Sequence, residues 1–372
     1  MKISFEDRRL EGIRDKVEAG ARLSYEDGVA LYRSRDLLAL GYLANRVRER
    51  QHGDVTDFNV NRHINPTDVC VASCRLCAFG KQKRDPNSYT MSLEQVWETA
   101  GKGWSEAITE FHIVGGLHPE LNLDWFCQML RGLKERFPAI HLKAFTMVEI
   151  GYFARREKMS IRDVLVKLRD AGMDSLPGGG AEVFSERVRR IICDHKLTGD
   201  EWLETARTAH ELGLHSNCTM LYGHIENEED RVDHLVRLRG LQDQTNGFVT
   251  FIPLAFHPQN TALSHISKTT GFDDLKNIAV ARLMLDNIPH IKAYWIMMTP
   301  KVAQVALRFG ANDIDGTVVE EKIYHEAGAT TSQSMRRGEL LRLIKLAGRT
   351  PVERDTLYRP VQRTESAFTV LV

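Results

Sequence analysis

From about residue 60 onward, strand-like and helix-like segments alternate along the chain, and this alternation restricts the fold more than any other feature. The helix-like segments begin with recognisable capping patterns, such as Ser92 with Gln95 and Thr198 with Glu201. The strand candidates are 61–69, 110–116, 141–150, 172–177, 215–223, 247–256, 291–298 and 312–319. Eight strand–helix units predict an α/β protein built on a (β/α)8 barrel, and an open doubly wound sheet is the alternative.

The ends of the chain fall outside this pattern. Residues 1–55 read as helix alone, with Ser24 as one cap and an amphipathic segment at 37–51 that ends near Gly53. We therefore expect an N-terminal helical extension at 1–55, the barrel at 56–360 and a C-terminal tail at 361–372.

Charge and hydropathy limit the partners of such a chain. Its 372 residues carry 50 Lys and Arg against 50 Asp and Glu, so the formal net charge is zero. A chain with this balance has no excess of basic residues to bind nucleic acid or an anionic membrane. The balance therefore favours a small-molecule substrate. No apolar run approaches the ~20 residues that span a bilayer, and the N-terminus is charged rather than signal-like. We expect a cytoplasmic protein.

Three of the six cysteines form a C-x3-C-x2-C run directly after the first predicted strand, at Cys70, Cys74 and Cys77. Thiolates suit iron–sulfur clusters, and full ligation of a cluster by protein needs four of them. Three cysteines leave one iron of a 4Fe–4S cubane open, where the amino and carboxylate groups of S-adenosylmethionine (SAM) can chelate. A zinc site or unrelated buried thiols are the alternative. Cys127, Cys193 and Cys218 stand alone and read as small buried hydrophobes.

Glycine-rich segments follow two of the other predicted strands. Gly115 and Gly116 come after the second strand, and 178–180 with Glu182 come after the fourth. Glycine lets the backbone approach a ligand closely, and such an edge can bind the SAM amino group. We expect Glu182 to bond ribose hydroxyls or an ammonium. Plain turns are the alternative.

Segments along the predicted barrel resemble those of the aminofutalosine synthases, which act in the futalosine pathway of menaquinone biosynthesis. The resemblance covers about residues 55–360 and rests on HINPTDVC, AFGK, GGLHP, PGGGAEVF, CTMLYGHIE at 218–226, FIPLAFHPQNTAL at 251–263 and NDIDGTVVEEKIYHEAGA at 312–329. Dehypoxanthine futalosine cyclase and the radical synthases of the deazaflavin redox cofactor share the cluster loop and a segment like GGGAE. These hydrogen-abstracting relatives are the alternative.

The resemblance implies a radical SAM barrel with a 4Fe–4S cluster and SAM, supplied by an electron donor such as flavodoxin or ferredoxin. The implied substrate is 3-[(1-carboxyvinyl)oxy]benzoate. The 5′-deoxyadenosyl radical adds to its vinyl CH2 instead of abstracting hydrogen. Aryl migration and loss of the carboxylate then give 6-amino-6-deoxyfutalosine and methionine.

Candidate ligand residues follow from this assignment. Leu76 stands where many radical SAM loops place an aromatic residue against adenine, and Phe79 lies two residues beyond the last cysteine. Further expected cofactor contacts are Gly115, Gly116, Glu182, His224 and Glu226. A dianionic substrate needs donors inside the barrel, and the expected contacts are His63, Asn65, Glu149, His257, Asn260, Thr261, Asn312 and Asp313. For His257, a satisfied loop histidine is the alternative.

Arginines do not supply an evident benzoate partner. Arg155, Arg156, Arg189 and Arg190 occur in charged stretches and read as solvated helix faces. His325, beyond the last predicted strand, either closes over the site or lies on a surface helix.

Overall fold

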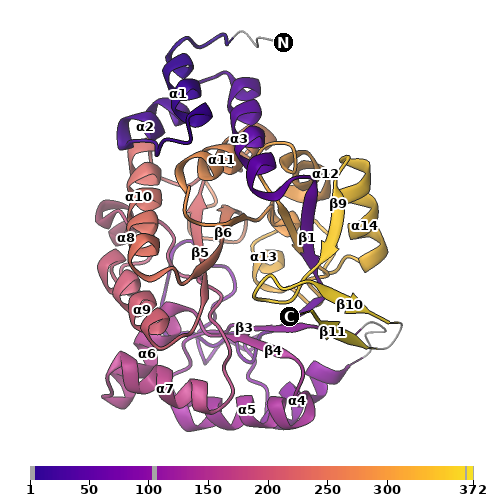
Figure 1. The fold of residues 1–372 in the computed structure, drawn as a ribbon. Helices are drawn as coiled ribbons and strands as arrows, with labels where there is room; N and C mark the ends of the chain where they lie inside the picture. The colour runs from indigo at the N-terminus through magenta and orange to yellow at the C-terminus, as the bar shows by residue number, and fades with distance from the viewer. Residues whose placement is uncertain (1–4, 103–106, 365–366, 372) are drawn as a thin grey trace.

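The computed structural model describes residues 5–102, 107–364 and 367–371 and shows a closed ring of parallel strands surrounded by helices (Figure 1). The barrel strands are β1 (Val55–Asn59) continuing into β2 (Asn61–Ile64), β3 (Glu110–Ile113), β4 (His141–Ala144), a short strand at 175–176, β5 (Ser216–Tyr222), β6 (Phe248–Ala255), β7 (His290–Ile291) and β8 (Asp313–Gly316). The predicted (β/α)8 barrel is confirmed.

Short parallel bridges close the ring where the longer ladders stop. Lys143 pairs with Ser175, Leu176 with Ser216, and Lys292 with Asp313. The last gap is closed by the pairing of β1 with β8 and of Arg62 with Val319. Because all the strands run the same way, their carboxyl ends meet at one end of the barrel, which is where (β/α)8 enzymes build their active sites.

Helices alternate with the strands and cover the outside of the ring (Figure 1). They are α1 (Arg9–Glu18), α2 (Tyr25–Arg33), α3 (Leu37–His52), α4 (Leu93–Gly101), α5 (Leu123–Arg136), α6 (Met147–Glu157), α7 (Ile161–Asp170), α8 (Glu186–Ile192), α9 (Gly199–Glu211), α10 (Glu228–Thr245), α11 (Gly271–Met284), α12 (Trp295–Ala306), α13 (Ile323–Glu326) and α14 (Arg337–Leu346). Both capping boxes expected from the sequence form, with Ser92 starting α4 and Thr198 starting α9.

Two of the predicted strands run on into helices. The segment 141–150 leaves the sheet at Ala144, because Thr146 and Glu149 form a capping box that starts α6. The segment 291–298 contributes only the end of β7, and α12 begins at Trp295. A short apolar run fits a buried strand and a buried helix equally well, so its periodicity could not separate the two.

The terminal segments pack onto the barrel. Helices α2 and α3 lie against α10 and α11, and the Arg22 guanidinium pairs with Asp243 and Asp286 (Figure 1). At the other end, β9 (Thr350–Glu353) pairs in parallel with β1, and β10 (Val361–Arg363) forms a hairpin with β11 (Phe368–Val370). The expected tail thus contains a hairpin, and the division into three segments stays a prediction.

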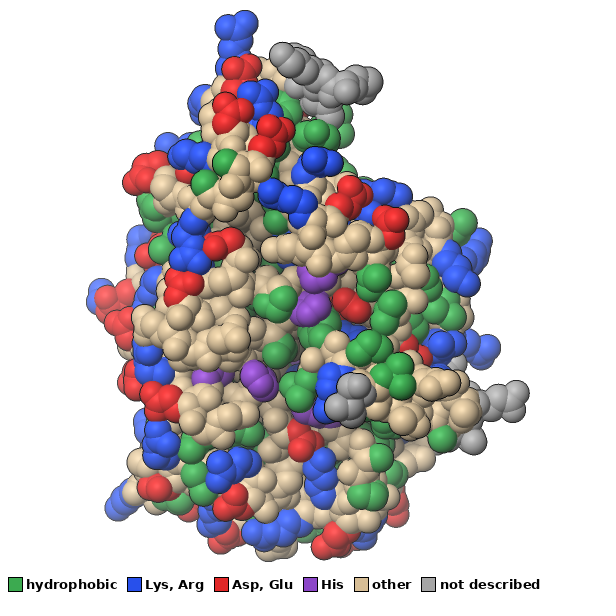
Figure 2. Space-filling model, viewed as in Figure 1, with side chains coloured by type: hydrophobic (Ala, Val, Ile, Leu, Met, Phe, Trp, Pro, Cys, Tyr) green, Lys and Arg blue, Asp and Glu red, His purple; other side chains and the backbone are tan. Residues whose placement is uncertain are grey.

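The surface is consistent with the balanced composition. Acidic and basic side chains are interspersed over the face shown in Figure 2, without a broad area of a single sign. Within the described ranges, no helix combines the length and the apolar character that crossing a bilayer requires.

Candidate active site

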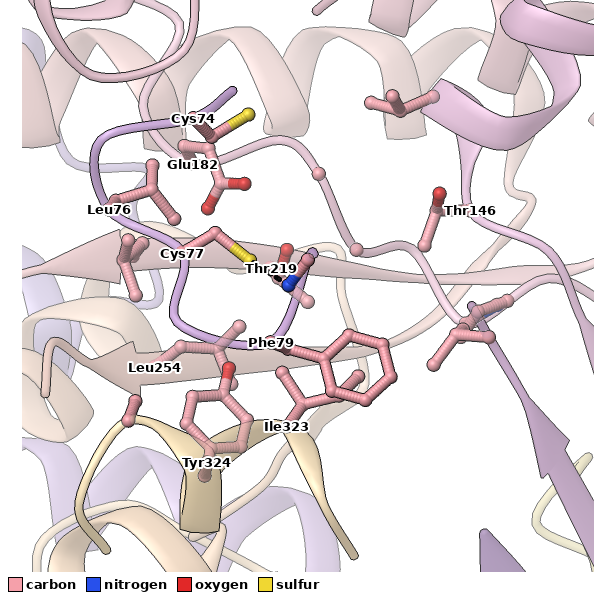
Figure 3. A pocket seen from close by; sticks show the side chains of 18 of the residues that line it. Cys74, Leu76, Cys77, Phe79, Thr146, Glu182, Thr219, Leu254, Ile323 and Tyr324 are labelled. Atoms are coloured by element: carbon pink, nitrogen blue, oxygen red, sulfur yellow. Dashed lines mark hydrogen bonds between the residues drawn. The ribbon is translucent and has the colours of Figure 1, made fainter. Parts of the chain in front are cut away.

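A pocket lies at the carboxyl ends of the barrel strands (Figure 3). Loops that follow the strands form the rim of the pocket. Side chains within the strands form its walls deeper in the barrel. The rim includes Cys70, Cys74, Leu76, Cys77, Phe79, Gly115, Gly116, Gly179 and Glu182, which the sequence had placed after strand ends, and Glu149, which it had placed at the end of a strand. Ile252, Leu254 and Phe256 of the β6 segment add an apolar wall.

The cysteine loop is held in place by backbone hydrogen bonds on both flanks. The Cys70 N–H donates to the Lys81 carbonyl (2.9 Å), and the Arg75 N–H donates to the Ile192 carbonyl (3.0 Å). The Gly80 N–H donates to the Cys77 sulfur at 3.3 Å. A Cβ at Gly80 would lie 3.7 and 3.8 Å from the sulfurs of Cys70 and Cys77, so both thiols flank this glycine. The loop is therefore fixed with its sulfurs gathered at the pocket.

These residues fit a three-cysteine 4Fe–4S cluster. Cys70, Cys74 and Cys77 line the pocket, and no fourth cysteine does so among the described residues. In the same part of the chain no three His, Cys, Asp or Glu side chains converge tightly enough to hold a single metal ion. Cys127, Cys193 and Cys218 are buried, as expected for small hydrophobes.

Burial acts on the Cys74 thiol in the absence of a cluster. It raises the pKa of Cys74 to about 11, and the Lys196 ammonium acts in the opposite direction. Lys196 also lies in the pocket wall and bonds Glu182 at 2.7 Å. Glu182, predicted as a ribose or ammonium contact, is thus already paired with an ammonium of the protein. Lys196 had not been identified from the sequence, although it lies in the segment between Glu182 and α9.

The two glycine segments differ in what surrounds them. A Cβ on Gly116 would lie 2.2 Å from the Val69 carbonyl oxygen, so this glycine allows the loop after β3 to pack on the cysteine loop. A Cβ on Gly179 would meet only the Thr146 Cγ2, at 3.0 Å. Gly116 therefore has a packing role in addition to lining the pocket, whereas Gly179 faces freer space.

Glu149 reaches the pocket from the first turn of α6. Its carboxylate accepts hydrogen bonds from the N–H of Thr146 (2.7 Å), the hydroxyl of Thr146 (2.8 Å) and the N–H of Gly115 (3.1 Å). Burial raises the pKa of Glu149 to about 7, and these three donors oppose the rise. The side chain links the loops after β3 and β4, and its predicted role as a ligand contact stays a prediction.

Two of the arginines predicted to be solvated bond loop carbonyls around the site: Arg189 in α8 is buried, and Arg156 in α6 is half-buried. Arg189 is 4% exposed and donates to the carbonyls of Ala181 (2.5 Å) and Val183 (3.3 Å), which hold the loop that carries Glu182. Arg156 donates to the His118 carbonyl at 3.0 Å. The prediction was wrong for both, because charged stretches of sequence do not reveal carbonyls that are brought close by the fold.

His224 and Glu226 do not line the pocket. The Glu226 carboxylate accepts hydrogen bonds from the N–H groups of Gly223 (2.6 Å) and His224 (2.9 Å) and from the Arg231 guanidinium (2.6 Å). Both predicted side chains are fully buried. The group closes the turn after β5, and a direct contact to SAM stays a prediction.

The buried Glu226 predicts a pH-dependent contribution to stability. Its hydrogen-bond partners and the Arg231 charge lower its pKa to about 2. A carboxyl with a lowered pKa in the folded state stabilises the protein above its ordinary pKa, and this contribution is lost as the pH falls from about 4.5 to 2. Glu226→Gln should therefore lower the free energy of unfolding by about 3 kcal/mol at pH 7.

Urea denaturation at pH 7 and at pH 3 measures this difference, which should shrink at the lower pH. Glu186→Gln is the control, because Glu186 and Arg190 form an ion pair that is 71% exposed on each side. Its effect should stay below about 1 kcal/mol. Equal losses in both variants at pH 7 would contradict the role assigned to Glu226.

The predicted substrate residues divide into two groups. His63 and His257 line the pocket together with Glu149. The His257 Nε2 contacts the Met297 carbonyl at 3.1 Å, and its Nδ1 has no partner within the described residues. The other five lie outside the pocket lining and are Asn65, Asn260, Thr261, Asn312 and Asp313.

The five residues outside the pocket lining form hydrogen bonds or ion pairs with nearby protein groups instead. Asn65 donates to the Val114 carbonyl (2.9 Å), Asn260 donates to the Glu326 carbonyl (2.9 Å), and Thr261 donates to the Pro258 carbonyl (2.7 Å). Asn312 accepts from Arg282, and Asp313 pairs with Arg354 at 2.5 Å. His325 bonds the Thr331 carbonyl at 2.8 Å, while its neighbour Tyr324 lines the pocket (Figure 3).

Several pocket residues were not identified from the sequence. Besides Lys196, they include His112, Lys143, Asn217, Lys292, Asp315 and Tyr324. A single polar residue inside an apolar strand was the available signal for Lys143 and Lys292. Leu76 and Phe79 both line the pocket as expected, and which side chain packs on adenine stays a prediction.

Comparison with known proteins agrees with this geometry. Residues 64–238 match the radical SAM superfamily, and residues 245–367 match the CofH/MqnC C-terminal region. Aminodeoxyfutalosine synthase from Thermus thermophilus is 48% identical over 360 residues, which cover 96% of this chain and 97% of the relative. The enzyme of that name from Streptomyces coelicolor is 46% identical over 364 residues, covering 95% and 94%.

A solved structure supports the fold. Methylornithine synthase has a TM-score of 0.71 to this chain at 20% identity, with 91% of this chain and 97% of that one covered. The sequence similarity to the two synthases extends through the cysteine loop, the barrel and the C-terminal region, so it includes every part of the pocket. The chain belongs to the aminodeoxyfutalosine synthase family of radical SAM enzymes.

Proposed function

We propose that this protein joins the 5′-deoxyadenosyl group of SAM to 3-[(1-carboxyvinyl)oxy]benzoate and so makes 6-amino-6-deoxyfutalosine for menaquinone biosynthesis. The new carbon–carbon bond joins C5′ of the adenosyl group to the vinyl CH2. The aryl group then migrates from oxygen to carbon, and the carboxylate leaves as carbon dioxide or bicarbonate. Methionine is the other product.

The observation that carries this proposal is the gathering of three cysteines at a pocket, with no fourth among the described residues that line it, in a chain whose similarity to the synthases is nearly full-length. Cys70, Cys74 and Cys77 would hold a 4Fe–4S cluster, which would supply the electron that splits SAM and recover it when the closed-shell product forms. The chain itself has to hold SAM and the enol ether together and keep water and hydrogen donors away from the reacting carbon.

The pocket walls suit that task. Ile252, Leu254 and Phe256 form an apolar side, and Ile323 and Tyr324 of α13 lie opposite the cysteine loop (Figure 3). An apolar enclosure positions the vinyl carbon without offering it a polar group to react with. The glycine loops after β3 and at 178–180 leave backbone groups close to the space beside the cysteines.

Isotope transfer tests the proposal. Reconstituted protein is incubated anaerobically with a chemical reductant, the carboxyvinyl benzoate and SAM labelled with ¹³C in the adenosyl group. We expect the label in a product that also contains the benzoate ring, and little free 5′-deoxyadenosine, because no hydrogen is abstracted. Mass spectrometry measures both species.

The control for isotope transfer omits the benzoate substrate and should give only slow cleavage of SAM. Stoichiometric 5′-deoxyadenosine without an adduct would reject the synthase reaction and favour a hydrogen-abstracting relative such as the futalosine cyclase. An absence of SAM cleavage under all conditions would favour an iron–sulfur electron carrier.

The electron donor is part of this proposal. Arg75, Lys83 and Arg84 are exposed in and beside the cysteine loop, and they suit an acidic partner such as flavodoxin or ferredoxin. A donor bound there would reach the cluster over a short distance. A cytoplasmic location stays a prediction of the sequence.

A further inference from the structure

The pocket contains a second level of polar side chains below the cysteine and glycine loops. His63, His112 and Lys143 are register partners on the adjacent strands β2, β3 and β4. Asn217 lies in β5, and Lys292 directly follows β7. All five line the pocket, and we call them the inner tier. Residues within parallel strands lie deeper than residues after their carboxyl ends, so a ligand that spans the pocket has one end at the cysteines and the other at this tier.

The lysines of the inner tier have N–H donors that their carboxylate partners leave unused. The Lys143 ammonium pairs with Glu110 at 2.8 Å, and the Lys292 ammonium pairs with Asp315 at 2.9 Å. Each ammonium has three donors, so a single carboxylate does not satisfy it. Both lysines are nearly inaccessible, at 3% and 2% exposure.

Asn217 supplies an independent observation. It is 2% exposed and lines the pocket, and within the described residues its Nδ2 has no hydrogen-bond partner. A buried donor without a partner is costly, and an acceptor on a bound ligand removes that cost. An acceptor on a ligand bound in the pocket would supply the missing partner.

The two lysines carry the positive charge of the inner tier, and the carboxylates of Glu110 and Asp315 lie beside them. Burial lowers the pKa values of both His63 and His112, so the stacked pair, whose ring centroids are 4.4 Å apart, contributes neutral rings. Two ammonium groups and one amide N–H, all in a nearly dry site, form an arrangement that suits a carboxylate.

We propose that the inner tier binds the benzoate carboxylate of the substrate, through the ammonium groups of Lys143 and Lys292 and the amide of Asn217. This assignment rests on the proposed function, which supplies a substrate with two carboxylates. The carboxylate on the vinyl group is lost in the reaction and lies with the reacting carbon near the cysteines. The ring carboxylate persists in the product, so it is the carboxylate that stays bound to the inner tier throughout the reaction.

The assignment is tested by the ratio of kcat/KM for two substrates, because this ratio does not depend on the absolute activity of a variant. The probes are the carboxyvinyl benzoate and its analogue with a ring carboxamide in place of the ring carboxylate. In the reconstituted wild-type protein, kcat/KM for adduct formation should be roughly 100-fold higher with the carboxylate. In Lys292→Met combined with Asp315→Asn, which removes both members of the ion pair, this preference should fall to roughly 10-fold or less.

Further variants keep the test independent of folding defects. Lys143→Met with Glu110→Gln and the single change Asn217→Leu should each reduce the preference, mainly through a higher KM for the carboxylate, while the dissociation constant of SAM stays unchanged. Lys134→Met with Asp174→Asn removes an ion pair outside the pocket and should keep the wild-type ratio. Iron content and circular dichroism identify any variant that fails to fold.

The outcomes separate this inference from the proposed function. If the wild type forms the adduct and the ratio stays near 100 in the folded inner-tier variants, the carboxylate binds elsewhere and the inference is wrong. If the wild type forms no adduct with the carboxylate substrate, the proposed function itself fails. A ratio near 1 in the wild type would also overturn the inference.

Discussion

Replacing Cys70, Cys74 or Cys77 with alanine should abolish SAM cleavage. After anaerobic reconstitution the wild type should bind about four irons and four sulfides per chain, because three thiolates suffice for a cubane with one open iron. The three cysteines line one pocket, and among the described pocket residues there is no other cysteine to replace a lost ligand. Each variant should therefore lose most of its iron and its methionine release in the presence of reductant.

Cys127→Ala is the matched control for these three changes. Cys127 is buried in α5 and does not line the pocket, so its loss should leave iron content and SAM cleavage nearly unchanged. Iron and sulfide analysis together with methionine release provide the measurement. Wild-type activity in any of the three pocket variants would refute the cluster assignment.

Gly116→Ala should have a far larger effect than Gly179→Ala, although both glycines line the pocket. The added Cβ at Gly116 would lie 2.2 Å from the Val69 carbonyl oxygen, which is backbone directly before Cys70. The loop after β3 and the cysteine loop must then separate, and we expect a loss of about 3 kcal/mol in unfolding free energy together with poor cluster loading. At Gly179 the nearest atom is the Thr146 Cγ2 at 3.0 Å, so a small side-chain shift suffices.

Chemical denaturation and iron content distinguish the two variants. Gly179→Ala should remain within about 1 kcal/mol of the wild type and should chiefly weaken SAM binding. If Gly116→Ala folds and loads its cluster like the wild type, the packing of these two loops is looser than the structure indicates. If SAM affinity is unchanged in Gly179→Ala, its loop is a plain turn.

The sequence predicted the parts of this protein that depend on local chemistry. Capping boxes at Ser92 and Thr198 and the alternation of strands and helices gave the barrel, since these signals act over a few residues. The sequence-based prediction was less successful where strand and helix were similarly favourable for the same segment. The run after Lys292 is apolar throughout, and only packing against the rest of the barrel made it a helix.

The candidate site shows the same division. The C-x3-C-x2-C spacing predicted that Cys70, Cys74 and Cys77 lie together, because cluster ligation requires them on one short loop, and all three line the pocket. Glu226 and Asp313 were expected in the site but are paired with Arg231 and Arg354, partners that are not evident from the polar residues near a strand end. Likewise, Glu182 was identified without Lys196, which satisfies it.

The sequence by itself determined the fold class, the family and the grouping of three cysteines on one loop. Tertiary structure alone decided which polar side chains share the pocket. Lys143 and Lys292 are each one charged residue within an apolar segment, more than a hundred positions apart. Strand register and closure of the ring bring them to the same cavity as Asn217. Local periodicity specifies which face of a strand a side chain occupies, but the neighbours on that face depend on pairing between distant strands.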